Sequence, residues 1–149
     1  MVAQGASKAY LAEVPQLTYD LVGFVHGEEA SALSELPSIA TTATASSPAG
    51  SYPVTVSGGT ADDYVFAYQP ATLLVGDTAQ SIAFFANLDA TYGDGPVELN
   101  ATAGSGLPVS YASSDSTVAE VNGTQLIFRG AGAAVVTASQ GGSANYDPA

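Results

Sequence analysis

Alternation of apolar and polar side chains dominates this chain and predicts β-strands along its length. Residues 52–57 and 97–103 show the alternation most clearly, with an apolar side chain at every second position. This period of two places one face of a strand toward a core. Weaker versions of the pattern predict further strands at residues 17–24, 38–44, 64–68, 71–75, 81–86, 108–111, 118–121, 124–129 and 133–139. The chain is therefore expected to be mainly β.

One segment, residues 28–35, has a helical pattern instead. Glu28 and Glu29 would lie at the positive end of the helix dipole, and Ala30 and Leu33 would share one face. The segment should end before Pro37, because the residue that precedes a proline is pushed out of the α region. We expect one short helix here and no other.

Turn residues divide the strands. Asn122-Gly123 separates two alternating segments and is typical of a type I′ hairpin, in which both central residues need a positive φ. Pro53 should mark the start of its strand or an edge, because proline cannot donate a ladder hydrogen bond. A Tyr shortly before a Pro occurs in both halves, as Tyr10 with Pro15 and as Tyr92 with Pro96. This repetition predicts the same entry turn in each half.

A break in the apolar pattern at residues 76–79 predicts two domains, residues 1–76 and 77–149. Each would have a thin core at about 75 residues, because small domains bury a lower fraction of their surface. In the first domain, a strand, a helix and then further strands follow one another, which is the β-grasp order. The second has short strands, frequent turns and no helix, which indicates a β-sandwich.

Two sets of segments also resemble known families. Residues 21–27 and 50–58 enclose an acidic segment and a Thr/Ser/Ala run, and this order resembles the MBG modules, which are β-grasp-type modules of large bacterial surface and secreted proteins. Residues 91–96 and 106–115 resemble the bacterial immunoglobulin-like repeats that often follow such modules. The resemblance implies a structural role in an adhesin-like repeat protein. It also puts Tyr10 at the usual place in the MBG opening, although Leu11 replaces the glycine that usually follows.

The resemblance further implies that both modules lack a strand at their outer ends, the first before Lys8 and the second after Tyr146. A missing strand leaves unpaired backbone groups that can pair with another chain. The expected partners are neighbouring repeats of a longer chain. We also expect an edge of the second module to be completed by a strand of another copy or by the chain's own N-terminal segment.

Composition narrows the function classes. Only two of the 149 residues are Lys or Arg, and the net charge is −12, which argues against nucleic acid and against anionic membranes as partners. A hydrophobic fraction of 46% is too high for a disordered acidic chain. No apolar run approaches the roughly 18 residues of a membrane span. The first residues do not form a signal peptide, so the extracellular or cell-surface location that the resemblance implies requires an export signal elsewhere on a longer chain.

Candidate chemistry is sparse. The sequence has a single histidine, His26, and no cysteine, so a zinc site cannot be completed, and no Gly-x-Ser-x-Gly motif accompanies a nucleophilic serine. A carboxylate pair for glycoside hydrolysis is not excluded, but half-chains of this size leave little room for a deep cleft. Lys8 could form an isopeptide cross-link to an Asn or Asp, or be a surface lysine at a turn, and we expect the latter. We therefore expect no catalytic residue and no cofactor.

Calcium is the one ion that the sequence leaves open, through five aspartates in expected turns: Asp62, Asp63, Asp89, Asp94 and Asp115. Turn aspartates usually bond their own backbone, and no spaced acidic loop is present, so we expect the fold not to depend on metal. The function expected is a non-catalytic spacer. The alternative is a glycan- or protein-binding module that acts through loops or an exposed sheet edge, for which the eight tyrosines could supply stacking surfaces.

Overall fold

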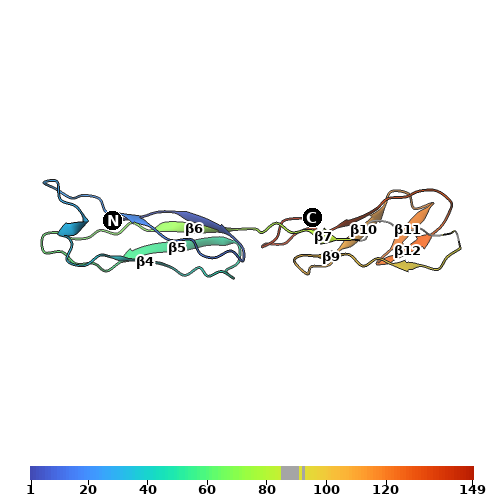
Figure 1. Ribbon diagram of the computed structural model, residues 1–149, viewed down its shortest axis with the longest axis horizontal. Helices are drawn as coiled ribbons and strands as arrows, with labels where there is room; N and C mark the ends of the chain where they lie inside the picture. Colours follow the sequence, from blue (N-terminus) through green and yellow to red (C-terminus); the bar gives the residue numbers. More distant parts are fainter. Residues whose placement is uncertain (85–90, 92) are drawn as a thin grey trace. The chain divides into compact units, whose positions relative to one another are not determined.

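The computed structural model describes residues 1–84, 91 and 93–149, and it is mainly β, as predicted (Figure 1). The chain divides into two compact units, Met1–Thr78 and Ala79–Ala149. The division lies inside the segment where the apolar pattern breaks. No helix among the described residues is long and apolar enough to cross a membrane.

The first unit is built on a four-stranded sheet in which β2 runs parallel to β6, and β5 runs antiparallel to both of its neighbours. A short β1 precedes β2 and pairs antiparallel with β3. β2 and the last strand of the unit, β6, therefore lie side by side (Figure 1). The strands are β1 Val2–Ala3, β2 Ala6–Ala9, β3 Tyr19–Asp20, β4 Ser38–Thr41, β5 Gly50–Ser57 and β6 Ala71–Gly76, and the sheet order is β2-β6-β5-β4.

One face of this sheet forms the core of the first unit. Val54 of β5 and Leu73 and Val75 of β6 are buried. Thr72 and Leu74, which alternate with the buried residues of β6, are exposed. This is the alternation that the sequence predicts. The β4–β5 ladder ends at the Thr41–Val54 pair, so β5 has only β6 as a ladder partner at Pro53. Proline is tolerated at this point because one side of the strand needs no backbone donor.

Two predictions for the first unit are wrong. Residues 28–35 contain only a 3-10 helix, η1 Ala30–Ala32, without a side-chain cap. Ser34 and Glu35 instead donate their backbone N–H groups to the Thr60 carbonyl, so this long-range pairing replaces the helical hydrogen bonds. Residues 64–68 are not a β-strand, although Tyr64 and Phe66 are partly buried and Val65 is exposed. Alternating side chains without a backbone partner do not form a ladder.

A turn hydrogen bond closes both of the segments that were expected to share an entry turn, although Tyr92 itself lies outside the described residues. Ala12 donates to the Ala9 carbonyl, and Asp94 donates to the Thr91 carbonyl. The third residue of each turn has a positive φ, 66° at Leu11 and 100° at Gly93. At Leu11 the positive φ fits a type II turn, because the preceding Tyr10 does not have a positive φ, and this position of the turn favours glycine. Leu11 therefore keeps the turn in a backbone conformation that costs an L-residue about 1–2 kcal/mol.

Replacing Leu11 with glycine should stabilise the first unit by about 1 kcal/mol. The leucine side chain is 53% exposed, so little packing is lost on its removal. Denaturant unfolding measures the change. Leu36→Gly is the matched control, because Leu36 is also exposed but does not have a positive φ, and this variant should lose stability. A loss of stability in Leu11→Gly would show that the leucine makes contacts that outweigh the strain.

The described residues of the second unit form three small antiparallel sheets. β7 pairs with β9, β10 pairs with β13, and β12 lies between β11 and β8. Leu99, Ala119 and Leu126 form its buried core, with Phe84 and Tyr111 packed against them. The strands are β7 Ile82–Ala83, β8 Val97–Glu98, β9 Thr102–Ala103, β10 Ser110–Ser113, β11 Ala119–Asn122, β12 Gln125–Phe128 and β13 Val136–Ser139.

The predicted strand at residues 97–103 is interrupted by a tyrosine. The Tyr111 hydroxyl donates to the Leu99 carbonyl at 3.0 Å and accepts from the Ala101 N–H at 2.7 Å. One side chain thus satisfies two backbone groups that a ladder would otherwise use. The segment divides into β8 and β9, which join different sheets.

The predicted hairpin at residues 118–129 is present, but its turn differs from the expected one. Asn122 pairs with Gln125, so the two loop residues are Gly123 and Thr124. Gly123 has a φ of 63°, whereas neither Asn122 nor Thr124 has a positive φ. Glycine at the first loop position fits a type II′ turn, in which only this residue needs the left-handed conformation. The Asn-Gly interpretation as type I′ was therefore wrong by one residue.

Candidate functional site

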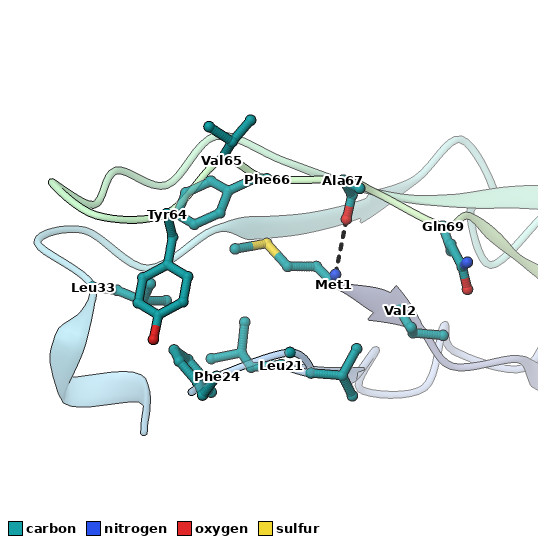
Figure 2. Close-up of a pocket in the computed structure, with 12 residues that line it drawn as sticks. Met1, Val2, Leu21, Phe24, Leu33, Tyr64, Val65, Phe66, Ala67 and Gln69 are labelled. Atoms are coloured by element: carbon teal, nitrogen blue, oxygen red, sulfur yellow. Dashed lines mark hydrogen bonds between the residues drawn. The ribbon is translucent and has the colours of Figure 1, made fainter. Parts of the chain in front are cut away.

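A pocket of about 310 Å³ lies in the first unit, where the N-terminal segment meets residues 21–24 and 64–69. Figure 2 shows the Met1 side chain between Phe24 and Leu21 on one side and Tyr64 and Phe66 on the other. Most of the lining residues are apolar, and together they are Met1, Val2, Leu21, Val22, Gly23, Phe24, Leu33, Tyr64, Val65, Phe66, Ala67 and Gln69.

Aromatic packing and hydrogen bonds hold the wall of this pocket. The rings of Phe24 and Tyr64 meet edge to face, with centroids 5.4 Å apart. The Tyr64 hydroxyl donates to the Glu28 carboxylate and accepts from the Val25 N–H at 3.2 Å. The hydrogen bond to Glu28 raises the pKa of Tyr64, because loss of the phenolic proton would place two negative charges together. Tyr64 therefore joins the loop of residues 24–28 to the segment that follows residue 63.

Among the side chains that line the pocket, only the Tyr64 phenol offers a group for acid–base or nucleophilic chemistry, and the Met1 ammonium group donates to the Ala67 carbonyl at 2.8 Å. His26 is exposed and has a φ of 57°, which is the left-handed conformation of a turn residue. Among the described residues, no three or more His, Asp or Glu side chains gather as a metal site. The pocket is lined mainly by apolar residues, which suits a small apolar group.

Sequence reasoning missed this pocket. Its aromatic wall, Phe24 with Tyr64 and Phe66, belongs to two segments that were both interpreted as strands. The signal available was the density of aromatic residues at 64–68 directly after the acidic pair Asp62-Asp63. A segment without a ladder partner can direct such side chains into a pocket.

Most of the tyrosine hydroxyl groups in the described structure donate hydrogen bonds to backbone carbonyl groups in loops. Tyr19 donates to the Pro37 carbonyl at 2.9 Å, and Tyr52 donates to the Pro48 carbonyl at 2.9 Å. Tyr68 donates to the Gly58 carbonyl at 2.7 Å, and Tyr111 donates as described above. Each of these bonds satisfies a loop carbonyl that has no place in a ladder. These hydroxyl groups are therefore engaged in contacts within the protein.

Lys8 connects two loops of the first unit. Its ammonium group donates to the carbonyls of Ala9 at 3.2 Å, Ala12 at 3.0 Å and Ala45 at 3.0 Å. All three donors of the side chain have acceptors. Lys8 lies in β2 and not in a turn as expected, and its side chain makes a structural contact 37 residues away in the sequence.

The candidate calcium ligands do not converge in the described structure. Asp62 and Asp63 are exposed in the first unit, whereas Asp94 and Asp115 belong to the second, and Asp89 lies outside the described residues. The Asp94 carboxylate accepts from the Thr91 N–H at 2.7 Å.

The Asp115 carboxylate is engaged in the same way as that of Asp94. It accepts from the Thr117 N–H at 2.9 Å and the Thr117 hydroxyl at 2.6 Å. These bonds lower the pKa of Asp115, because they favour the ionised carboxylate. Both carboxylates therefore bond their own turns, as aspartates in turns usually do.

The melting temperature should therefore be the same with calcium and with chelator. Differential scanning calorimetry of the full chain in each condition measures this, with magnesium as the control for nonspecific screening of the acidic surface. A rise of more than roughly 5 °C with calcium alone, on the order of 1 kcal/mol, would show that the aspartates form a site.

Comparison with known families supports the MBG resemblance in the first unit. The family model for the MBG domain (YGX type) matches residues 1–74, which is nearly the whole of Met1–Thr78. Neither the curated proteins nor the solved structures give a match. The first unit is thus supported as an MBG module, and it is a mainly β unit.

Proposed function

We propose that the chain is a non-catalytic structural module pair, a spacer within a bacterial cell-surface or secreted adhesin-like repeat protein. The match of residues 1–74 to the MBG family carries this proposal. In the first unit, the parallel pairing of β2 with the last strand, β6, suits a β-grasp-like arrangement. The second unit, with its small antiparallel sheets, suits an immunoglobulin-like repeat.

The use of polar side chains also supports a structural role. Lys8 and the tyrosine hydroxyls of both units bond loop carbonyls, and the Asp94 and Asp115 carboxylates bond backbone N–H groups. Such contacts stabilise loop conformations. They also occupy amine, hydroxyl and carboxylate groups of the kinds that catalytic sites use. No metal or cofactor is part of the proposal, and the partners are neighbouring repeats of the same longer chain, outside the cell.

The spacer function is tested by display on a cell surface. One, two or three copies of the chain are placed between an anchor and a fluorescent reporter, and the height of the reporter above the membrane is measured. We expect equal increments of height for each added copy. Flexible Gly/Ser linkers of the same residue number are the control, because their reach grows only with the square root of length. Heights that match those of the linkers would refute the spacer function.

The pocket favours a second function, the binding of a protein segment. Three exposed valines, Val22, Val25 and Val65, lie at or beside it, and Glu28 and Asp63 bring negative charge to Tyr64 in its wall. The ligand that fits is a peptide with an apolar side chain next to a basic one. We expect such a peptide to bind weakly to the unmodified chain and not to bind to the Val22→Asp variant. Chemical-shift changes at Phe24 and Phe66 on addition of the peptide measure the binding to each protein. Equal shifts in both proteins, or a glycan-array signal without peptide binding, would exclude this mode.

A further inference from the structure

In the first unit, the backbone pairing between the N-terminal segment and the segment of β6 extends beyond both ends of the β2–β6 ladder. β2 and β6 pair in parallel from Ala6–Leu73 to Ala9–Gly76. Before β6, the Gln69 N–H donates to the Met1 carbonyl and the Ala3 N–H donates to the Gln69 carbonyl, both at 2.9 Å. At the far end, the Tyr10 N–H donates to the Gly76 carbonyl at 2.8 Å. Backbone pairing therefore runs along the N-terminal segment from residue 1 to residue 10.

Parallel pairing determines how a pulling force reaches these hydrogen bonds. In a parallel pair, the start of one strand lies beside the start of the other, so the N-terminus of the unit and its exit after Gly76 lie at opposite ends of the ladder. Tension between these two points acts along the strands. All the hydrogen bonds of the ladder then resist together, whereas tension applied at one end of both strands opens them one after another.

Packing around the ladder protects it. Leu73 and Val75 of β6 are buried behind it, and Ala3 of the N-terminal segment belongs to the same core. Water therefore reaches the paired backbone from the exposed face only. The Lys8 ammonium adds a lateral connection from β2 to the Ala45 carbonyl. Sliding β2 along β6 would have to disrupt the ladder, this connection and the core at the same time.

We propose that the β2–β6 ladder is a force-bearing clamp, through which the first unit transmits tension along a longer chain without unfolding. The inference rests on the proposed spacer function and adds mechanical load to it. A spacer needs only to keep its length, whereas a clamp must also keep its fold when its two ends are pulled apart.

Single-molecule pulling in two directions tests the clamp. The sequence has no cysteine, so one introduced thiol gives a unique second handle beside a handle on the N-terminus. Asp77→Cys places this handle just after β6, which loads the ladder along its length. Val65→Cys places it before β6, on a side chain that is 101% exposed, which opens the ladder from one end. Both variants keep the full chain, and the second unit is not loaded.

We expect the peak unfolding force at one pulling rate to be about twofold higher with the Asp77 handle than with the Val65 handle, because forced unfolding reports the unfolding barrier along the pulled direction. Ala67→Cys, also exposed, is a second variant for end-loading in case Val65→Cys is destabilised. Thermal unfolding without load should be unchanged in the cysteine variants. Equal forces in the two directions would overturn the clamp and leave the height increments of the spacer test unaffected.

Discussion

Replacing Leu73 with alanine should lower the free energy of unfolding of the first unit by about 2–5 kcal/mol. Leu73 is fully buried in the centre of β6, between β2 and β5, and it belongs to the core with Val54 and Val75. Truncation removes its apolar contacts and leaves a cavity that the flanking strands cannot fill without shifting. In a unit of 78 residues, a loss of this size is a large part of the total stability.

The adjacent residue provides the control. Leu74 points to the opposite face of the same strand and is 53% exposed, so Leu74→Ala should change stability by no more than about 0.5 kcal/mol. Native-state hydrogen exchange separates the two units. Protection of the Val75 amide should fall in Leu73→Ala, whereas protection of the Val121 amide in the second unit should stay unchanged. Similar losses for the two leucines would contradict the assignment of faces in β6.

Replacing Gly142 with alanine should destabilise the second unit by at least about 2 kcal/mol. Gly142 has a φ of 79°, and a Cβ there would lie 2.8 Å from the Tyr146 carbonyl oxygen and 3.0 Å from the Pro148 nitrogen. Those neighbours are backbone atoms, so they cannot move aside as a flexible side chain would. Displacing them would break the paired hydrogen bonds between Gln140 and Ala149, at 2.7 and 2.9 Å.

Gly141 is the matched control for this substitution. A Cβ at Gly141 meets no atom within 4 Å, and its φ is not positive. Gly141→Ala should therefore be neutral or stabilising by about 0.4–1 kcal/mol, since alanine restricts the unfolded chain. Denaturant unfolding followed by the NMR signals of Leu126 and Ser139 compares the two variants. Tolerance of alanine at Gly142 would show that residues 143–149 do not contribute to the stability of the unit.

Much of the fold follows from local patterns. The alternating side chains at residues 52–57 predict β5 and form its one buried face, and the apolar segments beside turns at residues 71–75 and 124–129 predict β6 and β12. Aspartates in turns usually bond their own backbone, and Asp94 and Asp115 do so. These features depend on residues within a few positions of one another.

The wrong predictions share a different cause. Residues 28–35 form only a single 3-10 turn because Thr60, far away in the sequence, accepts hydrogen bonds from Ser34 and Glu35. Residues 97–103 do not form one strand because the Tyr111 hydroxyl bonds both Leu99 and Ala101. The hairpin turn is shifted by one residue through the pairing of its two strands. In each case, the backbone conformation depends on a hydrogen-bond or ladder partner that the pattern of the segment itself does not reveal.

The sequence by itself determined the mainly β class, the break at residues 76–79 and the burial alternation of β5, because a period of two and a run of small polar residues are local properties. The tertiary structure decided that β2 and β6 pair in parallel and that Lys8 reaches Ala45. It also decided that Phe24 and Tyr64 meet in the wall of a pocket. These contacts join residues 37 or more positions apart, and their free energy is realised only when the whole unit folds around them.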